Sequence, residues 1–493
     1  MSEQQLNYRS IFKATSLFGG VQLYQILVQV IRSKFLALFL GTTGMGINGL
    51  YSSTLDLIKK ITSLGLSQSA VRDISEASST RDYETISRTV IVLRRLVWFT
   101  GALGTIVVLV LSPLLSKVAF GNYDFAVPFA ILSITLLLDQ VSAGQKVILQ
   151  GTRRLKDLAR ASAIGSTIGL FISIPLYYFF RINGLVPTLV LNSLTMLGLS
   201  WFYSRRIKVK PIPVNNHEVL EGGATMLKMG IAMTISGALT AFSSFVIRWF
   251  IRTEGGVEIV GLFQAGFVIV NNYVGLVFSA LGTDFYPRLA GVSKDNNACM
   301  QIVNQQGEVA VLLIGPIICF CLVLMPIFVI LLYTRAFLDV NSFIIWALLG
   351  LLFKLLSWLV AFQFIAKGES RLFIINESAV NLYQLVFFYL GFRFWGLSGL
   401  GVAYALTYLV YSIQVYVIAN HRYGFTFSPS FRKEYSIQLF LAILCLLAVL
   451  LPINWMKFLF GGIVLFVSVV VSYKGLDNRL DISSFLKRKI NGA

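Results

Sequence analysis

The sequence predicts an all-α polytopic membrane protein of about 14 transmembrane helices, arranged as two parallel-repeat six-helix lobes plus two C-terminal helices. Three observations support this fold class. With 56% hydrophobic residues, 13% charged residues and a mean hydropathy of +0.76, the chain has too little polar surface to cover a soluble protein of 493 residues. Apolar runs long enough to cross a bilayer recur along the chain. Short patterns of the first half also return in the second half.

Each apolar run is a candidate spanning helix, because a helix needs roughly 20 residues to cross about 30 Å of hydrocarbon. The second run carries many polar residues, among them Asp56, Lys59 and Lys60, but the repeat aligns it with the apolar run 259–286. The runs cover residues 13–40, 48–72, 91–113, 127–150, 160–180, 184–204, 224–250, 259–286, 308–333, 341–366, 372–391, 396–420, 436–452 and 455–473.

An internal repeat relates the two halves, with its features in the same order and at a nearly constant separation. Similar halves in an apolar chain are typical of transporters whose substrate site lies where the halves meet. The repeated features are Gly49-Leu50-Tyr51 with Gly261-Leu262-Phe263, Arg32 with Arg248, Arg72 with Arg288, Gly151-x-x-Arg154-Leu155 with Gly368-x-x-Arg371-Leu372, and Gly184-Leu185 with Gly396-Leu397.

The repeat also sets the expected domains. A linker rich in basic residues contains Pro211 and Pro213, which cannot continue a helix. Because each lobe has an even number of spans, both enter the membrane from the same side, so the repeats are parallel. The expected domains are an N-lobe at 1–206, a cytoplasmic linker at 207–222, a C-lobe at 223–422, two further helices at 423–475 and a basic cytoplasmic tail at 476–493.

Lys and Arg predict the orientation. Alternate connections, beginning with the N-terminus, hold 27 of the 41 basic residues, and the other connections hold six. This bias predicts that both termini are cytoplasmic. The net charge of +19 is therefore mainly a topology signal, and no nucleic-acid partner is expected.

These features resemble a known group of transporters. Two parallel six-helix lobes, a polar first helix, the Gly-Leu-Tyr/Phe opening of helices 2 and 8, an Arg ending each of those helices and the Gly-x-x-Arg-Leu turns are similar to the multidrug/oligosaccharidyl-lipid/polysaccharide exporter (MOP) superfamily. The two extra C-terminal helices resemble its polysaccharide-transporter branch, the O-antigen translocases or Wzx-type flippases. Lipid II flippases also have fourteen helices, but the Arg-rich segment associated with them is absent from 32–60.

The resemblance implies a flippase rather than an enzyme. Such a protein moves a polyprenyl-diphosphate-linked oligosaccharide, an O-antigen or capsular repeat unit, from the cytoplasmic to the outer leaflet of the bacterial inner membrane by alternating access through a cationic central cavity. It implies membrane lipids, a polysaccharide polymerase and glycosyltransferases as partners, and no cofactor beyond a coupling proton or sodium gradient. One alternative is a multidrug/cation antiporter of the same superfamily, which the excess of Lys and Arg in the spans disfavours. Another is a polytopic membrane glycosyltransferase or polymerase, which usually needs a larger extramembrane loop.

Eight basic residues fall inside or at the ends of spans, where each costs about 2.5–3.5 kcal/mol near the bilayer centre. On helix 1, Gln22, Gln25, Gln29 and Arg32 share one face. On helix 7, Ser236, Thr240, Ser244 and Arg248 form a similar stripe. We expect both stripes to line a cavity and both arginines to bind phosphate; alternatively, both arginines extend outward to the interface. The eight residues are Arg32, Lys34, Lys59, Lys60, Lys146, Lys228, Arg248 and Lys354.

Two charges lie deeper in the spans. Lys354 is about twelve residues from the cytoplasmic end of helix 10, beyond comfortable reach of the interface. Asp139 lies at a comparable depth in helix 4 and is the candidate for coupling to an ion; its alternative role is a fixed ion pair with a neighbouring lysine. An i, i+4 pair between Asp56 and Lys60 would leave Lys59 free to face a ligand. The expected substrate-binding residues are Arg32, Arg248, Lys354, Lys59, Gln25 and Gln29, with no catalytic residue and no metal site.

Overall fold

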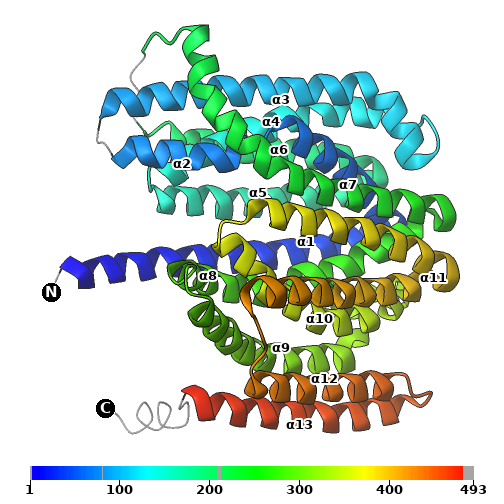
Figure 1. Cartoon of the computed structure of the whole chain (residues 1–493). Coiled ribbons are helices and arrows are strands. Elements are labelled where there is room, and N and C mark those ends of the chain that lie inside the picture. Colours follow the sequence, from blue (N-terminus) through cyan, green and yellow to red (C-terminus); the bar gives the residue numbers. More distant parts are fainter. Residues whose placement is uncertain (1–2, 80–81, 208–211, 481–493) are drawn as a thin grey trace, which may run out of the picture. The chain divides into compact units, whose positions relative to one another are not determined.

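The computed structural model describes residues 3–79, 82–207 and 212–480. Over these ranges it is helical and contains no strand, which confirms the all-α class. The elements are α1 (Glu3–Thr62), α2 (Leu66–Ser79), α3 (Tyr83–Phe120), α4 (Ala126–Gly151), α5 (Leu155–Phe180), η1 (Arg181–Gly184), α6 (Leu185–Ser204), α7 (Asn216–Val268), η2 (Ile269–Val274), α8 (Leu276–Gly291), α9 (Asn296–Leu332), η3 (Arg335–Val340), α10 (Asn341–Ala366), α11 (Ser370–Tyr423), α12 (Pro429–Val449) and α13 (Asn454–Leu480) (Figure 1).

Within the described ranges, nine helical stretches are long and apolar enough to cross a membrane, so the chain is an integral membrane protein. Four of these stretches, 20–62, 155–204, 234–291 and 370–423, are 43 to 58 residues long. A single crossing needs roughly 20 residues. Each of the four is therefore long enough for two crossings.

The breaks inside these long stretches recur at the spacing of the sequence repeat. α1 leaves helical geometry at Gly41 (φ 68°), and α7 does so at Gly256 (φ 84°). Both glycines adopt the left-handed region that other residues avoid. The α4–α5 turn at Arg153 (φ 57°) and the α10–α11 turn at Gly368 (φ 75°) have the same separation along the chain as these two glycines. The duplication is therefore visible in the backbone as well as in the sequence.

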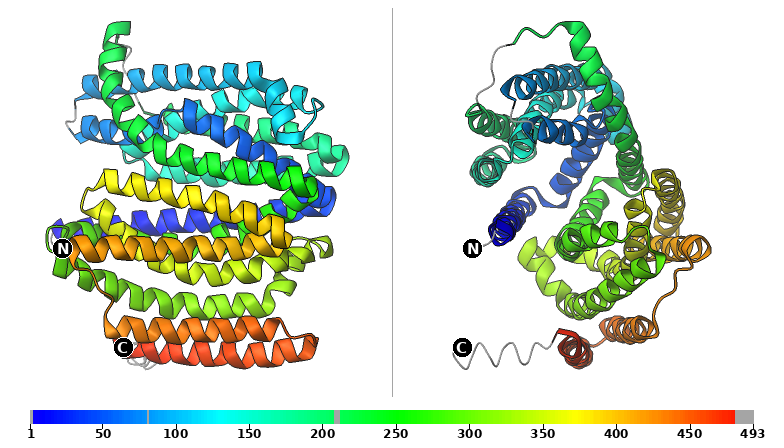
Figure 2. Two further views of the ribbon diagram at one scale, coloured as in Figure 1. Left: turned by 45° about the vertical axis from the view of Figure 1, so that its right-hand side comes forward. Right: turned by 60° about the vertical axis from the view of Figure 1, so that its left-hand side comes forward.

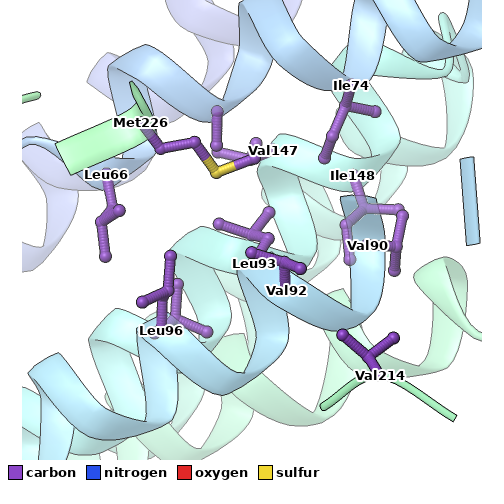
Figure 3. Close-up of a cluster of buried hydrophobic side chains, with 12 residues drawn as sticks. Leu66, Ile74, Val90, Val92, Leu93, Leu96, Val147, Ile148, Val214 and Met226 are labelled. Carbon is purple, nitrogen blue, oxygen red and sulfur yellow. The ribbon is translucent and has the colours of Figure 1, made fainter. Parts of the chain in front are cut away.

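The helices form two compact units, which we call unit 1 (Met1–Gly261 with Leu332–Thr334) and unit 2 (Leu262–Leu331 with Arg335–Ala493). In unit 1, an apolar core joins α2, α3 and α4. Figure 3 shows Leu93 and Leu96 of α3 near Val147 of α4, with Leu66 of α2 and Met226 of α7 beside them. This core surrounds the C-terminal end of α4, at Val147 and Ile148.

Glycines bring α1 and α7 into close contact within unit 1. A Cβ on Gly46 would lie 2.0 Å from the Val257 carbonyl oxygen, and a Cβ on Gly261 would lie 1.9 Å from the Thr42 carbonyl oxygen. At the separation of the two glycine breaks, Gly46 corresponds to Gly261 and Thr42 corresponds to Val257, so the repeat relates the two contacts to each other. The structural counterpart of Gly261 is thus Gly46. The Gly-Leu-Tyr/Phe motif of the sequence instead aligns Gly261 with Gly49. The alignment based on backbone packing therefore differs by three residues from the alignment based on side-chain identity.

In unit 2, α10 packs against α11, and α12 lies alongside α13 (Figures 1 and 2). The fully buried Gln438 of α12 joins the last two helices, because its amide donates to Ser472 Oγ (2.9 Å) and its carbonyl accepts from Ser468 Oγ (2.7 Å). Arg479 of α13 also pairs with Glu308 of α9 (2.8 Å). Polar side chains therefore fix α12 and α13 to the rest of the unit in an apolar solvent.

Candidate functional site

The charges of unit 1 gather where the part of α1 after Gly41 meets α4. Lys59 Nζ lies 2.8 Å from Asp139 Oδ2, and each side chain is about one-third exposed, at 36% and 34%. The structure thus joins the expected ligand-binding lysine to the expected coupling carboxylate. This is the ion-paired arrangement that the sequence allowed as an alternative for Asp139.

A cavity of about 280 Å³ opens beside this ion pair. It lies between α1, α4 and α7, and its wall carries ammonium, hydroxyl, amide and carboxylate groups. Within the described residues, no direct ion pair joins Asp56 to Lys60. Asp56 interacts electrostatically with Lys60 and also with Lys59, Asp139 and Arg248. The cavity is lined by Asp56, Lys59, Lys60, Ser63, Gly65, Ser67, Gln140, Ala143, Thr234 and Gly237.

Arg248 of α7 is buried, with 5% of its surface exposed. Its guanidinium donates to the Ser244 carbonyl oxygen (2.8 Å) and to Ser244 Oγ (2.5 Å), one turn earlier on the same helix. Its charge also acts on Asp56. The side chain therefore does not extend outward to the interface, because the expected polar stripe of α7 supplies its hydrogen-bond acceptors.

The arginine of the expected stripe on the first part of α1 lies near a different helix. Gln25, Gln29 and Arg32 are half-buried. Arg32 interacts electrostatically with the hydroxyl of Tyr177 on α5, against which α1 packs. In the ranges that the structure describes, no hydrogen bond connects these three side chains to the cavity beside Lys59. The structure thus pairs Lys59 with Asp139, lets Arg248 act on the neighbouring Asp56, and leaves Arg32 next to α5.

Lys354 forms a second cluster in unit 2. Its ammonium donates to Asn271 Oδ1 of η2 (3.0 Å) and to Tyr404 Oη of α11 (3.4 Å), and Tyr404 itself donates to Asn271 Oδ1 (3.0 Å). The ring of Tyr408 lies 5.0 Å from the ammonium, within the range of a cation–π contact. Glu377 acts on Lys354 electrostatically and accepts a hydrogen bond from Tyr411 (2.9 Å).

The two clusters occupy related positions of the repeat. Asp139 precedes Lys354, and Asp56 precedes Asn271, by the same separation that relates the two glycine breaks at Gly41 and Gly256. Asn271, Tyr404 and Tyr408 were not among the expected site residues, because neutral residues carry no charge signal in an apolar run. The repeat spacing, applied from Asp56, would have found Asn271.

Comparison with known proteins agrees with this architecture. A family model described as "Polysaccharide biosynthesis protein" matches residues 35–342. A curated relative named lipid III flippase, from Escherichia coli (strain K12), is 20% identical over 410 residues, which cover 82% of this chain and 96% of the relative. The lipid III flippase of Shigella flexneri matches with the same identity and coverage.

Solved structures show the same fold. An inward-facing multidrug resistance MATE family transporter of the MOP superfamily has a TM-score of 0.71 and 16% identity, covering 84% of this chain and 99% of its own. The lipid II flippase MurJ, in an inward closed conformation, has a TM-score of 0.69 and 12% identity, covering 94% of this chain and 99% of its own. These relatives are named as flippases or transporters, none as an enzyme. The chain therefore has the fold of the MOP superfamily, and it belongs to the polysaccharide biosynthesis protein family.

Proposed function

We propose that this protein is a flippase for a polyprenyl-diphosphate-linked oligosaccharide, an O-antigen or capsular repeat unit, which it moves from the cytoplasmic to the outer leaflet of the bacterial inner membrane. The observation that carries the proposal is the retention of cations inside apolar spans: Arg248 is buried, and Lys354 is held among aromatic rings. Cations in such places are costly unless they serve a ligand. Family membership and flippase-named relatives support the same substrate class.

The chemistry of the cargo fits these residues. A lipid-linked diphosphate carries its negative charge at the head group, so the head needs a polar, cationic passage while the polyprenyl chain stays in lipid. Guanidinium and ammonium groups form strong, charge-assisted hydrogen bonds with phosphate oxygens. Arg248, Lys354 and Lys59 are the proposed ligands, together with Arg32, Gln25 and Gln29 on the first part of α1. Asp139 is the proposed coupling carboxylate.

We further propose that transport proceeds by alternating access between the six-helix lobes 1–206 and 223–422, with 423–475 attached to the second lobe. Both termini, including the tail at 476–493, would then lie in the cytoplasm, where lipid-linked sugars are assembled by glycosyltransferases. A polymerase would take the product on the outer side. The basic connections of the sequence support this orientation.

Complementation tests the proposal. In a strain whose own flippase is deleted, the wild-type chain should restore surface polysaccharide, and Arg248→Ala and Lys354→Ala should abolish it while still reaching the membrane in normal amount. Lys117→Ala, in the last turn of α3 and a member of neither cluster, is the matched control and should restore polymer fully. Normal polymer from both cluster variants would reject these residues as ligands. If the wild-type chain moves organic cations and no lipid-linked sugar, the protein is an antiporter instead.

A further inference from the structure

The two repeats hold a lysine by different means. In unit 1, Lys59 is paired with the carboxylate of Asp139 at 2.8 Å. In unit 2, the position equivalent to Asp139 is itself a lysine, Lys354, which is bound by the amide of Asn271 and the phenol of Tyr404. A carboxylate in direct contact neutralises an ammonium, whereas an amide oxygen and a phenol satisfy its hydrogen bonds without an ion pair. Glu377 acts on Lys354 electrostatically, but among the described residues no direct ion pair joins the two.

We propose that the cavity of unit 1 is an anion-exchange site, in which phosphate oxygens of the cargo displace the Asp139 carboxylate from Lys59, whereas Lys354 of unit 2, whose hydrogen-bond partners are neutral, is an anchor that binds a phosphate without such a displacement. This inference rests on the proposed function and deepens it. Lys60, whose expected partner was Asp56, becomes a second ammonium of the ligand site. Asp139 then occupies the ammonium of Lys59 until the phosphate of the ligand replaces it.

The cavity has the donors that a diphosphate needs. Lys59 and Lys60 both line it, as do the hydroxyl groups of Ser63, Ser67 and Thr234. Lys60 reaches across to α7, since its Nζ would lie 3.9 Å from a Cβ on Gly237. Because position 237 has no side chain, the ammonium has room to turn toward a ligand in the cavity.

The displaced carboxylate has a second cation to balance it. Lys146 lies about two helical turns after Asp139 on α4 and interacts electrostatically with both Asp139 and Lys59. Among the charged residues of the cavity wall and those that interact electrostatically with them, Lys59, Lys60, Lys146 and Arg248 outnumber the carboxylates Asp56 and Asp139 by two charges. That excess matches the double negative charge of a diphosphate linkage. When an anion binds Lys59, the Asp139 carboxylate therefore still has Lys146 as a cation that acts on it.

Binding of inorganic pyrophosphate to the purified full-length protein in nanodiscs tests the exchange. Asp139→Asn removes the competing carboxylate and keeps the shape of the side chain, so the Kd for pyrophosphate should fall about fivefold, the effect of removing one partly exposed ion pair worth about 1 kcal/mol. Lys59→Gln removes a ligand, so the Kd should rise by at least as much. Asp124→Asn, in the exposed connection between α3 and α4, should leave the Kd unchanged.

A further variant tests whether a change in binding results from a change in folding. Lys59→Gln alone leaves Asp139 without its partner, so the double variant Lys59→Gln with Asp139→Asn replaces the ion pair with two neutral amides and should unfold at the temperature of the wild type. It should bind pyrophosphate as weakly as Lys59→Gln. If Asp139→Asn weakens pyrophosphate binding or leaves it unchanged, the ion pair is purely structural and the exchange is wrong.

Lys354→Gln separates the two roles. Its effect on pyrophosphate affinity should be the same in the wild type and in the Asp139→Asn variant, because Asp139 does not compete with the ligand for Lys354. The exchange and the proposed function can also fail independently. Suppose that the Kd for pyrophosphate falls in Asp139→Asn and rises in Lys59→Gln, but the wild-type protein restores no surface polysaccharide. The anion site would then stand and the flippase function would be rejected. If the protein restores polysaccharide but the two Kd values change in the same direction, the flippase function would stand and the exchange would be rejected.

Discussion

Gly46 and Gly261 face each other so closely that neither has space for a side chain. A Cβ on Gly261 would lie 3.0 Å from the Gly46 amide nitrogen and 1.9 Å from the Thr42 carbonyl oxygen. Backbone atoms cannot move aside as the end of a flexible side chain can. The crossing of α1 and α7 in unit 1 therefore depends on glycine at both positions.

We expect Gly261→Ala to destabilise the protein by about 1–3 kcal/mol, the usual cost of forcing an extra methyl group into a packed region. Thermal unfolding of the purified protein in detergent measures this effect. Gly198→Ala in α6 is the matched control, because a Cβ there meets nothing within 4 Å. An unfolding temperature for Gly261→Ala equal to that of Gly198→Ala would contradict the close crossing.

Asn271→Asp should give Lys354 of the second repeat a carboxylate partner, as Lys59 has in the first repeat. The new carboxylate would lie beside the Lys354 ammonium, which is 3.0 Å from Asn271 Oδ1, and would neutralise it. We expect surface polysaccharide to fall at least tenfold while the unfolding temperature stays at or above that of the wild type. Asn122→Asp, in the exposed α3–α4 connection, adds the same charge away from the cluster and should have no effect. Unchanged polymer from Asn271→Asp would show that the charge of Lys354 is not needed.

Arg479→Ala should loosen α13. The guanidinium, 22% exposed, pairs with Glu308 of α9 at 2.8 Å and with Glu434 of α12 at 3.4 Å, so its loss leaves two carboxylates without this partner. We expect a loss of about 1–3 kcal/mol in stability. Limited proteolysis should then cut the α12–α13 region first. Lys474→Ala, an exposed position on the same helix, should behave as the wild type.

Cysteine labelling can test the orientation. All four native cysteines are buried, so a membrane-impermeant thiol reagent should react mainly with an introduced cysteine. We expect Asn122→Cys to be labelled in intact cells and Lys294→Cys only after the membrane is permeabilised, because basic residues concentrate on the cytoplasmic side. Labelling of Lys294→Cys in intact cells would reverse the topology.

The helices and the duplication could be predicted because hydropathy and glycine placement are local signals. Apolar runs must satisfy their own backbone hydrogen bonds in lipid, and helices do so. Gly41 and Gly256 fit the breaks because left-handed geometry favours glycine. The bounds were less predictable: α1 runs from Glu3 to Thr62 across the break, since one helix follows the other with hardly a turn between them.

The candidate site was predictable only in its charged members. Lys59, Asp139 and Arg248 stand out because ions are rare in apolar spans. Their partners depend on which helices pack together, and the i, i+4 spacing of Asp56 and Lys60 does not reveal that Asp56 also interacts electrostatically with Lys59, Asp139 and Arg248. Asn271 and Tyr404 were missed, because an amide and a phenol are common in helices and reveal nothing until Lys354 is placed beside them.

The π-helical segment η2, which contains Asn271, carries a consequence for movement. Its backbone bond runs from Gly275 N to Val270 O, so this turn holds one residue more than an α-turn. A surplus residue can migrate along a helix one step at a time while most backbone hydrogen bonds persist. Each step rotates the side chains it passes by about 100°. A single step past Asn271 would swing its amide away from the Lys354 ammonium and uncover that charge without unwinding the helix.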